Sequence, residues 1–541
     1  MPNWVATEHG VVANTTSANP QQVALNTAAL NLSDAGGGNL IILTGQRIVT
    51  TGAYVGADNV TLVIEHGGAL AKESTSSSNL IFFDGCRNTH VTGGGTLDAG
   101  PAAGNTERSN RIRIRNSQNV SVTGMTIING ARSVQIQSGS AVDTSPRGIS
   151  SDITISHNHF AGSHRNVAIE VARNDSTSEG SDLGSENVSC DGNTFDEIER
   201  YSADTPPWTA IYYSGVTGGT VRDNVVLQSD DTAVMIAGGC VGVVVSGTRA
   251  TTNQVCIYLG ASRSCSVIDN PRLQSLNDIG IAVHARPDAV ASGGYTVGNH
   301  IVSGNHIVGT DRNGISVEGV SDVLVIGNKI RNPAGGIVRT TVVGTTATFV
   351  YSGSVPYTFV NLGPGSIRVG DASITPTSGG TEVEKDEPYT YHPQTGTGTT
   401  SDPYVPGTPA YAVSTSGQPA TVRRTLPDVY RAAILVQPNT VGAATIRPDN
   451  VSLIGNLVTL GASDGGSSGV IGIKTSGALK NFTCVGNNID SAITNQYSFS
   501  TAFGQGADVQ VAGRTDGKLY VASGGTNGFF PVLLGAAATP S

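Results

Sequence analysis

A short pattern of apolar and polar positions recurs along the chain, in which an apolar residue is followed three positions later by Asn. Its eight copies end at Asn158, Asn193, Asn224, Asn270, Asn305, Asn328, Asn456 and Asn487. The step from Asn305 to Asn328 is 23 residues, and the step from Asn224 to Asn270 is 46, with Val244-Val-Ser-Gly247 at the position between them. The longer steps fit the same unit with a loop added. The chain therefore consists largely of repeats of one structural unit.

A second apolar strand precedes most of these Asn residues by about half a unit. Strands this short, separated by Gly and Asn turns, cannot bury an apolar face alone, but they can do so when coil stacks upon coil. Asn tolerates the left-handed turn conformation, and its amide can bond to the Asn one coil away. We therefore predict an all-β fold, a right-handed, single-stranded parallel β-helix, in preference to a β-sandwich with scattered Asn turns. The second strands are 167–171, 210–213, 233–236, 255–259, 279–283 and 314–317.

The repeat also divides the chain. Residues 1–58 contain a predicted cap helix from Asn19 to about Ser33 and the first strands, and residues 59–339 form the β-helix. The repeat is absent from 340–430, which is rich in Thr, Gly, Pro and Tyr and is interpreted as an inserted β-rich subdomain or excursion. The final coils occupy 431–491, and 492–541 form a separate C-terminal β element.

Composition narrows the class. Of 541 residues, 70 are Gly, which is close to twice the share of about 7% in an average globular domain. Only 13% of the residues are charged, about half of the usual share of about 25%. No Gly-x-y period indicates collagen, and no apolar stretch is long enough for membrane insertion. A net charge of −10 argues against nucleic acid as a partner. Six Cys without CxxC spacing predict neither a zinc site nor a disulfide framework.

Three segments resemble the pectin-lyase-like β-helix superfamily, which includes phage tailspikes and polygalacturonase-like proteins. Residues 24–49 resemble the opening of these proteins, and residues 59–70 resemble their first full coil. Asn88-Thr-His-Val-Thr-Gly-Gly-Gly-Thr-Leu-Asp98 is similar to the Gly-Gly-Gly-Thr-Ile-Asp-Gly stretch of polygalacturonase-like hydrolases. The resemblance covers about the first 340 residues and implies the fold.

The catalytic motifs of polygalacturonases are present only in part. Asp230-Asp231 resembles the family's Asp-Asp element, and His284 stands about where the family has Lys. Gln254-Val-Cys replaces Gly-His-Gly, and no Asn-Thr-Asp is present. Cleavage of a polysaccharide other than pectin stays open.

Strand alternation sorts the side chains into columns. If Ile169 and its counterparts point inward, three outward columns follow, one of them containing Asp231, Gln254 and Asp278. Asp231 and Asp278 are two coils apart, so their backbones are about 10 Å apart, and an inverting glycosidase separates its carboxyl groups by about 6.5–9.5 Å. We predict Asp231 and Asp278 as the acid and base, with Asp230 as a spare candidate.

Other residues of these columns are candidates for substrate binding. Aromatic rings suit sugar faces, and His or Arg suits acidic sugar groups. Several have a plainer alternative: a turn residue for each Asp, a trimer interface for each Tyr, a solvated charge for Glu170 and an ordinary surface histidine for His284. The candidates are Trp208, Tyr212, Tyr258, His284, Arg286, Arg312 and Glu170.

The leading functional hypothesis is a virion-associated, tailspike-like receptor-binding protein. It would bind, and as a glycosidase cleave, a bacterial surface polysaccharide, as a homotrimer attached to other tail proteins. The first residues lack the pattern of a secretion signal, which favours release with a virion over secretion. The alternatives are a non-catalytic adhesive fibre of a virion and a secreted bacterial hydrolase or lyase. No cofactor or metal site is predicted, although a lyase would favour Ca²⁺ at the Asp cluster.

Overall fold

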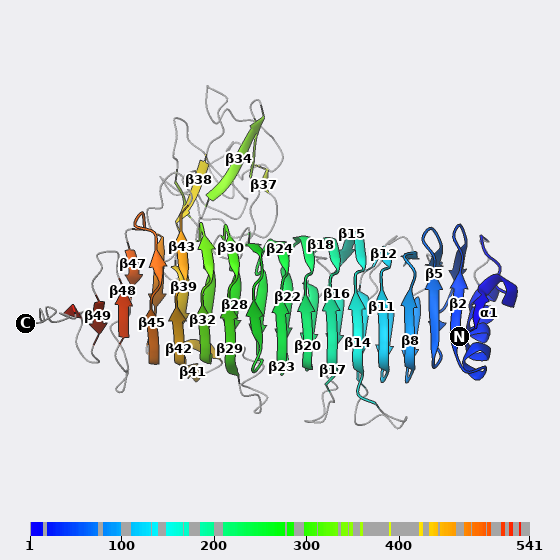
Figure 1. Cartoon of the computed structure of the whole chain (residues 1–541). Coiled ribbons are helices and arrows are strands. Elements are labelled where there is room, and N and C mark those ends of the chain that lie inside the picture. Colours follow the sequence, from blue (N-terminus) through cyan, green and yellow to red (C-terminus); the bar gives the residue numbers. More distant parts are fainter. Residues whose placement is uncertain are drawn as a thin grey trace, which may run out of the picture.

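In the computed structural model, the chain is a long solenoid built from three parallel sheets (Figure 1). The structure describes residues 2–14, 19–73, 79–98, 110–130, 132–138, 148–165, 167–172, 184–199, 209–275, 278–285, 297–310, 312–333, 337–343, 346–349, 358–360, 389–390, 421–425, 432–441, 444–460, 470–477, 479–493, 495–498, 510–513, 519–522 and 530–531.

Each coil contributes one strand to each sheet, and every neighbouring pair within the three sheets is parallel. The first sheet contains β1 (Asn3–Val5), β2 (Gly38–Ile42), β5 (Val60–Ile64), β8 (Arg87–Thr92), β11 (Gln118–Thr123), β14 (Ser151–Ser156), β17 (Glu186–Asp191), β20 (Thr217–Arg222), β23 (Val241–Ser246), β26 (Ser266–Ile268), β29 (Gly298–Ser303), β32 (Ser321–Ile326), β42 (Asp449–Ile454) and β45 (Lys480–Val485). The second contains β3 (Arg47–Thr50), β6 (Ala69–Lys72), β9 (Thr96–Asp98), β12 (Thr126–Ile128), β15 (His159–Arg165), β18 (Thr194–Glu199), β21 (Val225–Ser229), β24 (Arg249–Thr252), β27 (Arg272–Ser275), β30 (His306–Val308), β33 (Lys329–Arg331), β43 (Leu457–Thr459) and β46 (Asn488–Ile489). The third contains β4 (Tyr54–Val55), β7 (Ile81–Asp84), β10 (Asn110–Arg115), β13 (Arg132–Gln137), β16 (Val167–Ala172), β19 (Thr209–Ser214), β22 (Thr232–Ala237), β25 (Ile257–Gly260), β28 (Ile281–His284), β31 (Ile315–Glu318), β39 (Ala432–Gln437), β44 (Ile471–Thr475) and β47 (Asn495–Ser498).

This topology confirms the predicted right-handed parallel β-helix. The predicted cap is helix α1 (Asn19–Asp34), which contacts β2, β3 and β4 at the N-terminal end of the solenoid, beside the short 3-10 helix η1 (Ala6–His9). None of the described helices has the length and apolar character that crossing a membrane would require.

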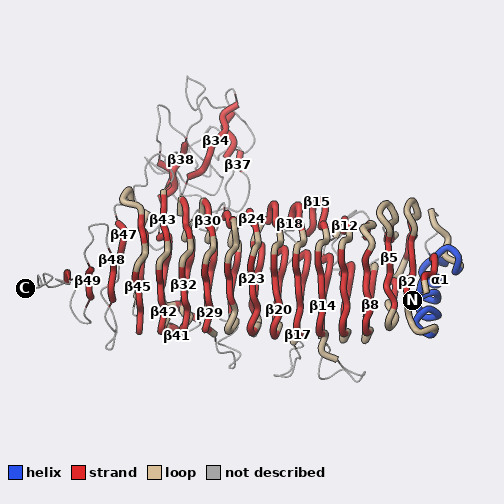
Figure 2. The backbone as a smooth tube through the Cα atoms, in the orientation of Figure 1, coloured by secondary structure: helices blue, strands red, loops and turns tan. Residues whose placement is uncertain are grey.

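The solenoid is interrupted once in sequence but not in stacking. Strand β31 pairs directly with β39, and β32 with β42, so the intervening residues are inserted between two adjacent coils. Within the insertion, β34 (Ile337–Val343), β35 (Thr346–Phe349), β36 (Thr358–Val360), β37 (Tyr389–Thr390) and β38 (Thr421–Thr425) form a separate antiparallel sheet (Figure 2).

Smaller antiparallel elements complete the described strands. They are the hairpin of β40 (Asn439–Val441) and β41 (Ala444–Ile446) and the sheet of β48 (Gln510–Gly513), β49 (Leu519–Ala522) and β50 (Phe530–Pro531). The exact domain boundaries stay predictions.

Apolar columns fill the interior of the solenoid. The column predicted from Ile169 is continuous in the register of the third sheet, and each of its members has no exposed surface. Burial of one such side chain contributes about 1.5–3 kcal/mol. The members of this column are Ile169, Ile211, Val234, Ile257, Ile281 and Ile315.

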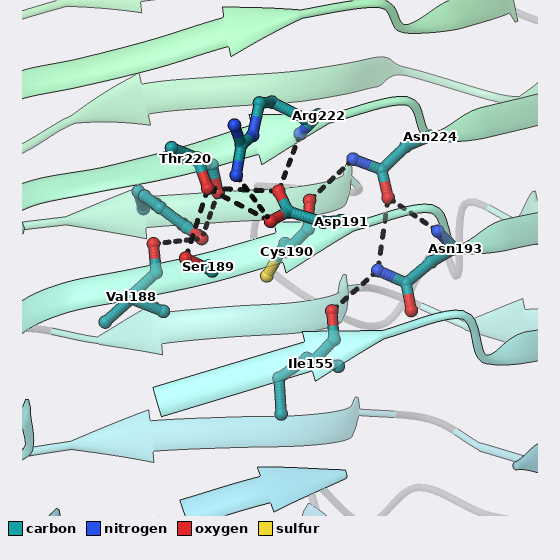
Figure 3. Close-up of polar contacts among 10 residues, drawn as sticks. Ile155, Val188, Ser189, Cys190, Asp191, Asn193, Thr220, Arg222 and Asn224 are labelled. Carbon is teal, nitrogen blue, oxygen red and sulfur yellow. Dashed lines mark hydrogen bonds and ion pairs between the residues drawn. The ribbon is translucent and has the colours of Figure 1, made fainter. Parts of the chain in front are cut away.

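The repeating Asn forms a buried ladder between the first and second sheets. In Asn193, the backbone N–H and Nδ2 both donate to Asn224 Oδ1, at 3.0 and 3.1 Å, and Nδ2 also donates to the Ile155 carbonyl (Figure 3). Asn305, Asn328 and Asn456 repeat this arrangement. Because the amide both donates and accepts, identical residues can stack without an unpaired group.

One detail of the predicted ladder was wrong. The ladder Asn does not adopt the left-handed conformation; the residue before it does, for example Asp223 (φ 55°), Asp269 (φ 51°) or Gly192 (φ 67°). A separate, exposed row of left-handed Asn lies where strands of the first sheet begin, as at Asn88 and Asn119, whose side chains are bonded at 2.8 Å.

Candidate functional site

The outward column predicted on the third sheet is in register, but four of its six members are buried and only Tyr212 and Tyr258 are partly exposed. Glu170 pairs in register with Tyr212, Tyr212 with Met235, and Met235 with Tyr258. Ala282 and Ser316 continue the same column on β28 and β31. Parallel register holds these side chains about 4.8 Å apart from coil to coil.

The three candidate carboxylates lie in the turns that lead from the second sheet into the third. Asp231 is 9% exposed, and its Oδ1 accepts the hydroxyl of Thr232 at 3.0 Å. Asp230 Oδ1 accepts Asn253 Nδ2 at 3.0 Å. The two neighbouring acids therefore contact different partners, one on its own strand and one on the next coil.

Backbone bonds stack these turns on one another. The Gln254 N–H donates to the Asp231 carbonyl and the Arg312 N–H to the Asp278 carbonyl, each at 3.1 Å, while the Ser275 hydroxyl donates to the Gln254 carbonyl. Asp231, Gln254, Asp278 and Arg312 thus occupy successive coils. The structure brings Asp231 and Asp278 onto one line with a single coil between them.

Asp278 is part of an ion pair. Its Oδ1 lies 3.1 Å from Arg312 Nη1, and the two side chains are only 19% and 11% exposed. The Asp278 N–H is held by the Ser275 hydroxyl at 2.9 Å. The Arg312 guanidinium thereby fixes the position of the Asp278 carboxylate.

A second polar cluster lies at the carboxyl ends of β28 and β31. His284 Nε2 lies 3.5 Å from Glu318 Oε1, and the same oxygen accepts the Ser316 hydroxyl at 2.7 Å. The Tyr258 ring meets the His284 ring edge to face, with centroids 5.6 Å apart. A histidine oriented by a carboxylate beside an aromatic ring can take part in proton transfer and in binding a sugar.

Glu170 belongs to a different group of contacts, several coils nearer the N-terminus. It is 6% exposed, accepts Gln135 Nε2 at 2.8 Å, and lies 3.2 Å from Arg132 Nη1. The alternative of a solvated surface charge is therefore wrong for Glu170. Trp208 and Arg286 lie outside the described residues.

Sequence reasoning did not include Glu318, Ser316 and Thr232 among the site residues. Glu318 was recognisable as the in-register neighbour of His284, because each is the last residue of its strand in the third sheet. Thr232 carried no signal of its own. Within the described part of the chain, no three His, Cys, Asp or Glu side chains gather closely enough to hold a metal ion.

No protein-family model matches the sequence, and no curated protein matches it. Solved structures with which the chain shares similarity include an exopolygalacturonase from Thermotoga maritima (14% identity, 61% of this chain and 87% of that chain covered, TM-score 0.41). A mannuronan C-5 epimerase A-module from Azotobacter vinelandii shares 12% identity (94% and 98% covered, TM-score 0.47). A tailspike protein of an E. coli bacteriophage, in complex with a pentasaccharide, shares 11% identity (78% and 94% covered, TM-score 0.34). These proteins have the pectin-lyase-like β-helix in common. The fold of the present chain is established by its own three parallel sheets.

Proposed function

We propose that the chain binds a bacterial surface polysaccharide along the outward face of the third sheet and hydrolyses it there. The observation that carries the proposal is the stacked line of Asp231, Gln254 and Asp278, which separates two carboxylates by two coils. Two coils correspond to about 10 Å between backbones, close to the separation of about 6.5–9.5 Å between the carboxyl groups of an inverting glycosidase.

In this mechanism Asp278 is the base. Arg312 orients its carboxylate through the ion pair, and Asp278 takes the proton from the attacking water. Asp231 is the acid that protonates the leaving glycosidic oxygen, with Thr232 fixing the rotamer of its side chain. Asp230, oriented by Asn253, is the spare acid. Asp278 thus assists formation of the bond to water, and Asp231 assists cleavage of the bond to the leaving sugar, from opposite sides of the sugar ring.

Substrate binding falls to the same face. Tyr212 and Tyr258 are half-buried and offer ring surface to sugar residues. His284 and Arg312 are proposed to hold acidic groups of the substrate. Glu170 contributes hydrogen-bond acceptors at the N-terminal side.

The biological setting is also part of the proposal. The resemblance of residues 24–49 and 59–70 to tailspikes supports a receptor-binding protein on a phage tail, assembled as a homotrimer and attached to other tail proteins. A secreted bacterial enzyme is the alternative setting. Size measurement by light scattering and detection of the chain in purified virions test these two points.

A test of hydrolysis uses the full chain on a panel of capsular polysaccharides and lipopolysaccharides, with new reducing ends as the readout. We expect Asp231→Asn and Asp278→Asn each to lower the rate by about a hundredfold or more. Asp152→Asn is the matched control: Asp152 is exposed on the first sheet, has φ 56°, and accepts Asn187 Nδ2 at 3.2 Å. Unchanged cleavage in both site variants would show that the acid and base are assigned wrongly.

A lyase is the second candidate, favoured by the contact between His284 and Glu318. A lyase removes the proton next to a uronate carboxylate and expels the neighbouring sugar, which leaves a double bond in the product. Ultraviolet absorbance of the products distinguishes this outcome from hydrolysis. Glycan binding without any new ends would instead indicate the adhesive fibre.

A further inference from the structure

Strand β10 carries an alternation that the proposed active site does not use. Its sequence, Arg111-Ile-Arg-Ile-Arg115, places Ile112 and Ile114 in the core with no exposed surface. The alternate residues Arg113 and Arg115 therefore lie on the outward face, with backbones about 6.6 Å apart. Both side chains are partly exposed.

Among the described side chains near Arg113, Arg115 and Arg132 form ion pairs. Arg115 pairs with Asp84, its Nε lying 2.9 Å from Oδ1. Arg132 pairs with Glu170. Arg113 instead donates Nε and Nη2 to the Gln137 side-chain oxygen, at 3.1 and 2.7 Å, and among the described residues it forms no ion pair. A neutral amide orients the guanidinium, and Asp84, whose side chain is bonded to Arg115, compensates its positive charge only in part.

The surroundings of Arg113 orient its guanidinium and also disfavour its charged form. The guanidinium carbons of Arg113 and Arg115 lie 5.8 and 5.4 Å from the centre of the Phe82 ring. Burial first, and then the charge of Arg115, lower the pKa of Arg113, while Asp84 acts in the opposite direction. An anion bound here would offset the repulsion between the two guanidinium groups.

Arg113 shares its column with the proposed site. It pairs in register with Gln135, Gln135 with Glu170, and Glu170 with Tyr212. Tyr212 in turn pairs with Met235 on β22, the strand that follows Asp231. The four strand steps from β10 to β22 span about 19 Å. Glu170, the acid that lies between them, is neutralised by Arg132 and therefore does not repel an anionic chain.

We infer that Arg113, oriented by Gln137 and Phe82, is a binding subsite for an anionic sugar residue, so that the substrate is an acidic polysaccharide extending along the third sheet from Asp231 to β10. This inference rests on the proposed function for the polysaccharide, but the subsite itself is defined by its affinity for anions. A guanidinium with free donor capacity suits carboxylate and sulfate groups alike.

The test measures binding of the full chain by affinity electrophoresis in gels containing polygalacturonate, dextran sulfate or neutral dextran. We expect retention by at least one anionic polymer and none by dextran. Arg113→Gln should weaken that retention by about tenfold to a hundredfold, since it removes a charge-assisted contact. Gln137→Glu places a carboxylate on Arg113 without removing any side chain of the fold, and it should weaken retention similarly.

Arg249→Gln is the matched control. Arg249 is exposed on β24 of the second sheet, and its substitution changes the net charge by the same amount as Arg113→Gln. Circular dichroism checks that each variant is folded. Retention that is unchanged in both Arg113→Gln and Gln137→Glu, or wild-type retention no stronger in the anionic gels than in dextran, overturns the subsite. Asp231→Asn should retain full binding, so loss of cleavage and loss of anion binding are separate results.

Discussion

The buried Asn ladder permits a prediction whose size follows from its bonds. Asn305 has no exposed surface, and its Nδ2 donates to the Val267 carbonyl at 2.9 Å and to Asn328 Oδ1 at 2.9 Å. Its Oδ1 accepts the backbone N–H and Nδ2 of Asn270, at 3.2 and 2.7 Å. Asn305→Ala therefore removes the partners of the Val267 carbonyl and of the N–H and Nδ2 of Asn270, all of which are buried from water.

Each buried polar group left without a partner costs about 1–3 kcal/mol. For three such groups, we therefore expect Asn305→Ala to lower the local free energy of unfolding by about 3–9 kcal/mol. Stacked repeats open locally, so the suitable assay is hydrogen exchange of the peptides covering β27, β30 and β33, combined with a urea titration. Protection should fall on both sides of the substituted coil.

The matched control lies in the same coil. Asn299 is exposed at φ 58°, and its Nδ2 donates to the Ser264 hydroxyl at 3.0 Å. Asn299→Gly also removes a ladder bond and keeps the left-handed backbone, but water replaces the lost partner, so its cost should stay below about 1 kcal/mol. If Asn305→Ala costs no more than Asn299→Gly, burial of the ladder does not determine its contribution to stability.

Three further predictions concern buried groups. Burial lowers the pKa of His164 and of His300 to about 4, below the unfolded value of 6.5. The contribution of each histidine to the free energy of unfolding is therefore fully present above pH 6.5, and about 3 kcal/mol of it is lost as the pH falls toward 4. Thermal midpoints measured between pH 7 and 4 should drop, and they should drop less in His164→Gln. Cys190, Cys240 and Cys256 have no exposed surface, and burial raises the pKa of each to about 12, so a thiol reagent at pH 8 should modify them only after denaturant is added. Phe195→Ala removes a ring stacked 4.6 Å from Phe160 and should cost about 3–5 kcal/mol in a urea titration, whereas a cost under 1 kcal/mol would mean that this part of the core can collapse.

The fold was predictable because the repeat combines two independent regularities. Alternation along each strand assigns inward and outward positions, and the recurrence of Asn aligns one coil with the next. Together they predict Glu170, Tyr212 and Tyr258 in one column of the third sheet, as the register shows.

Contacts between side chains were less predictable. The pairing of Asp278 with Arg312 joins residues 34 positions apart, so it depends on how much chain loops out between two coils. The orientation of Arg113 depends on the rotamer of Gln137, which no pattern of residue types encodes. The left-handed position was misplaced by one residue because Asp, Gly and Asn are adjacent in these turns and all of them tolerate that conformation.

The two turn lines on either side of the second sheet obey different physical limits. At the first, an amide that donates and accepts can be repeated on successive coils, as in Asn305, Asn328 and Asn456. A carboxylate cannot, because like charges stacked about 4.8 Å apart repel each other. The second line accordingly runs from Asp231 through the neutral Gln254 to Asp278 and then to the cationic Arg312. A line that carries acids must vary from coil to coil, and in a repeat protein such variation is itself a guide to where chemistry can take place.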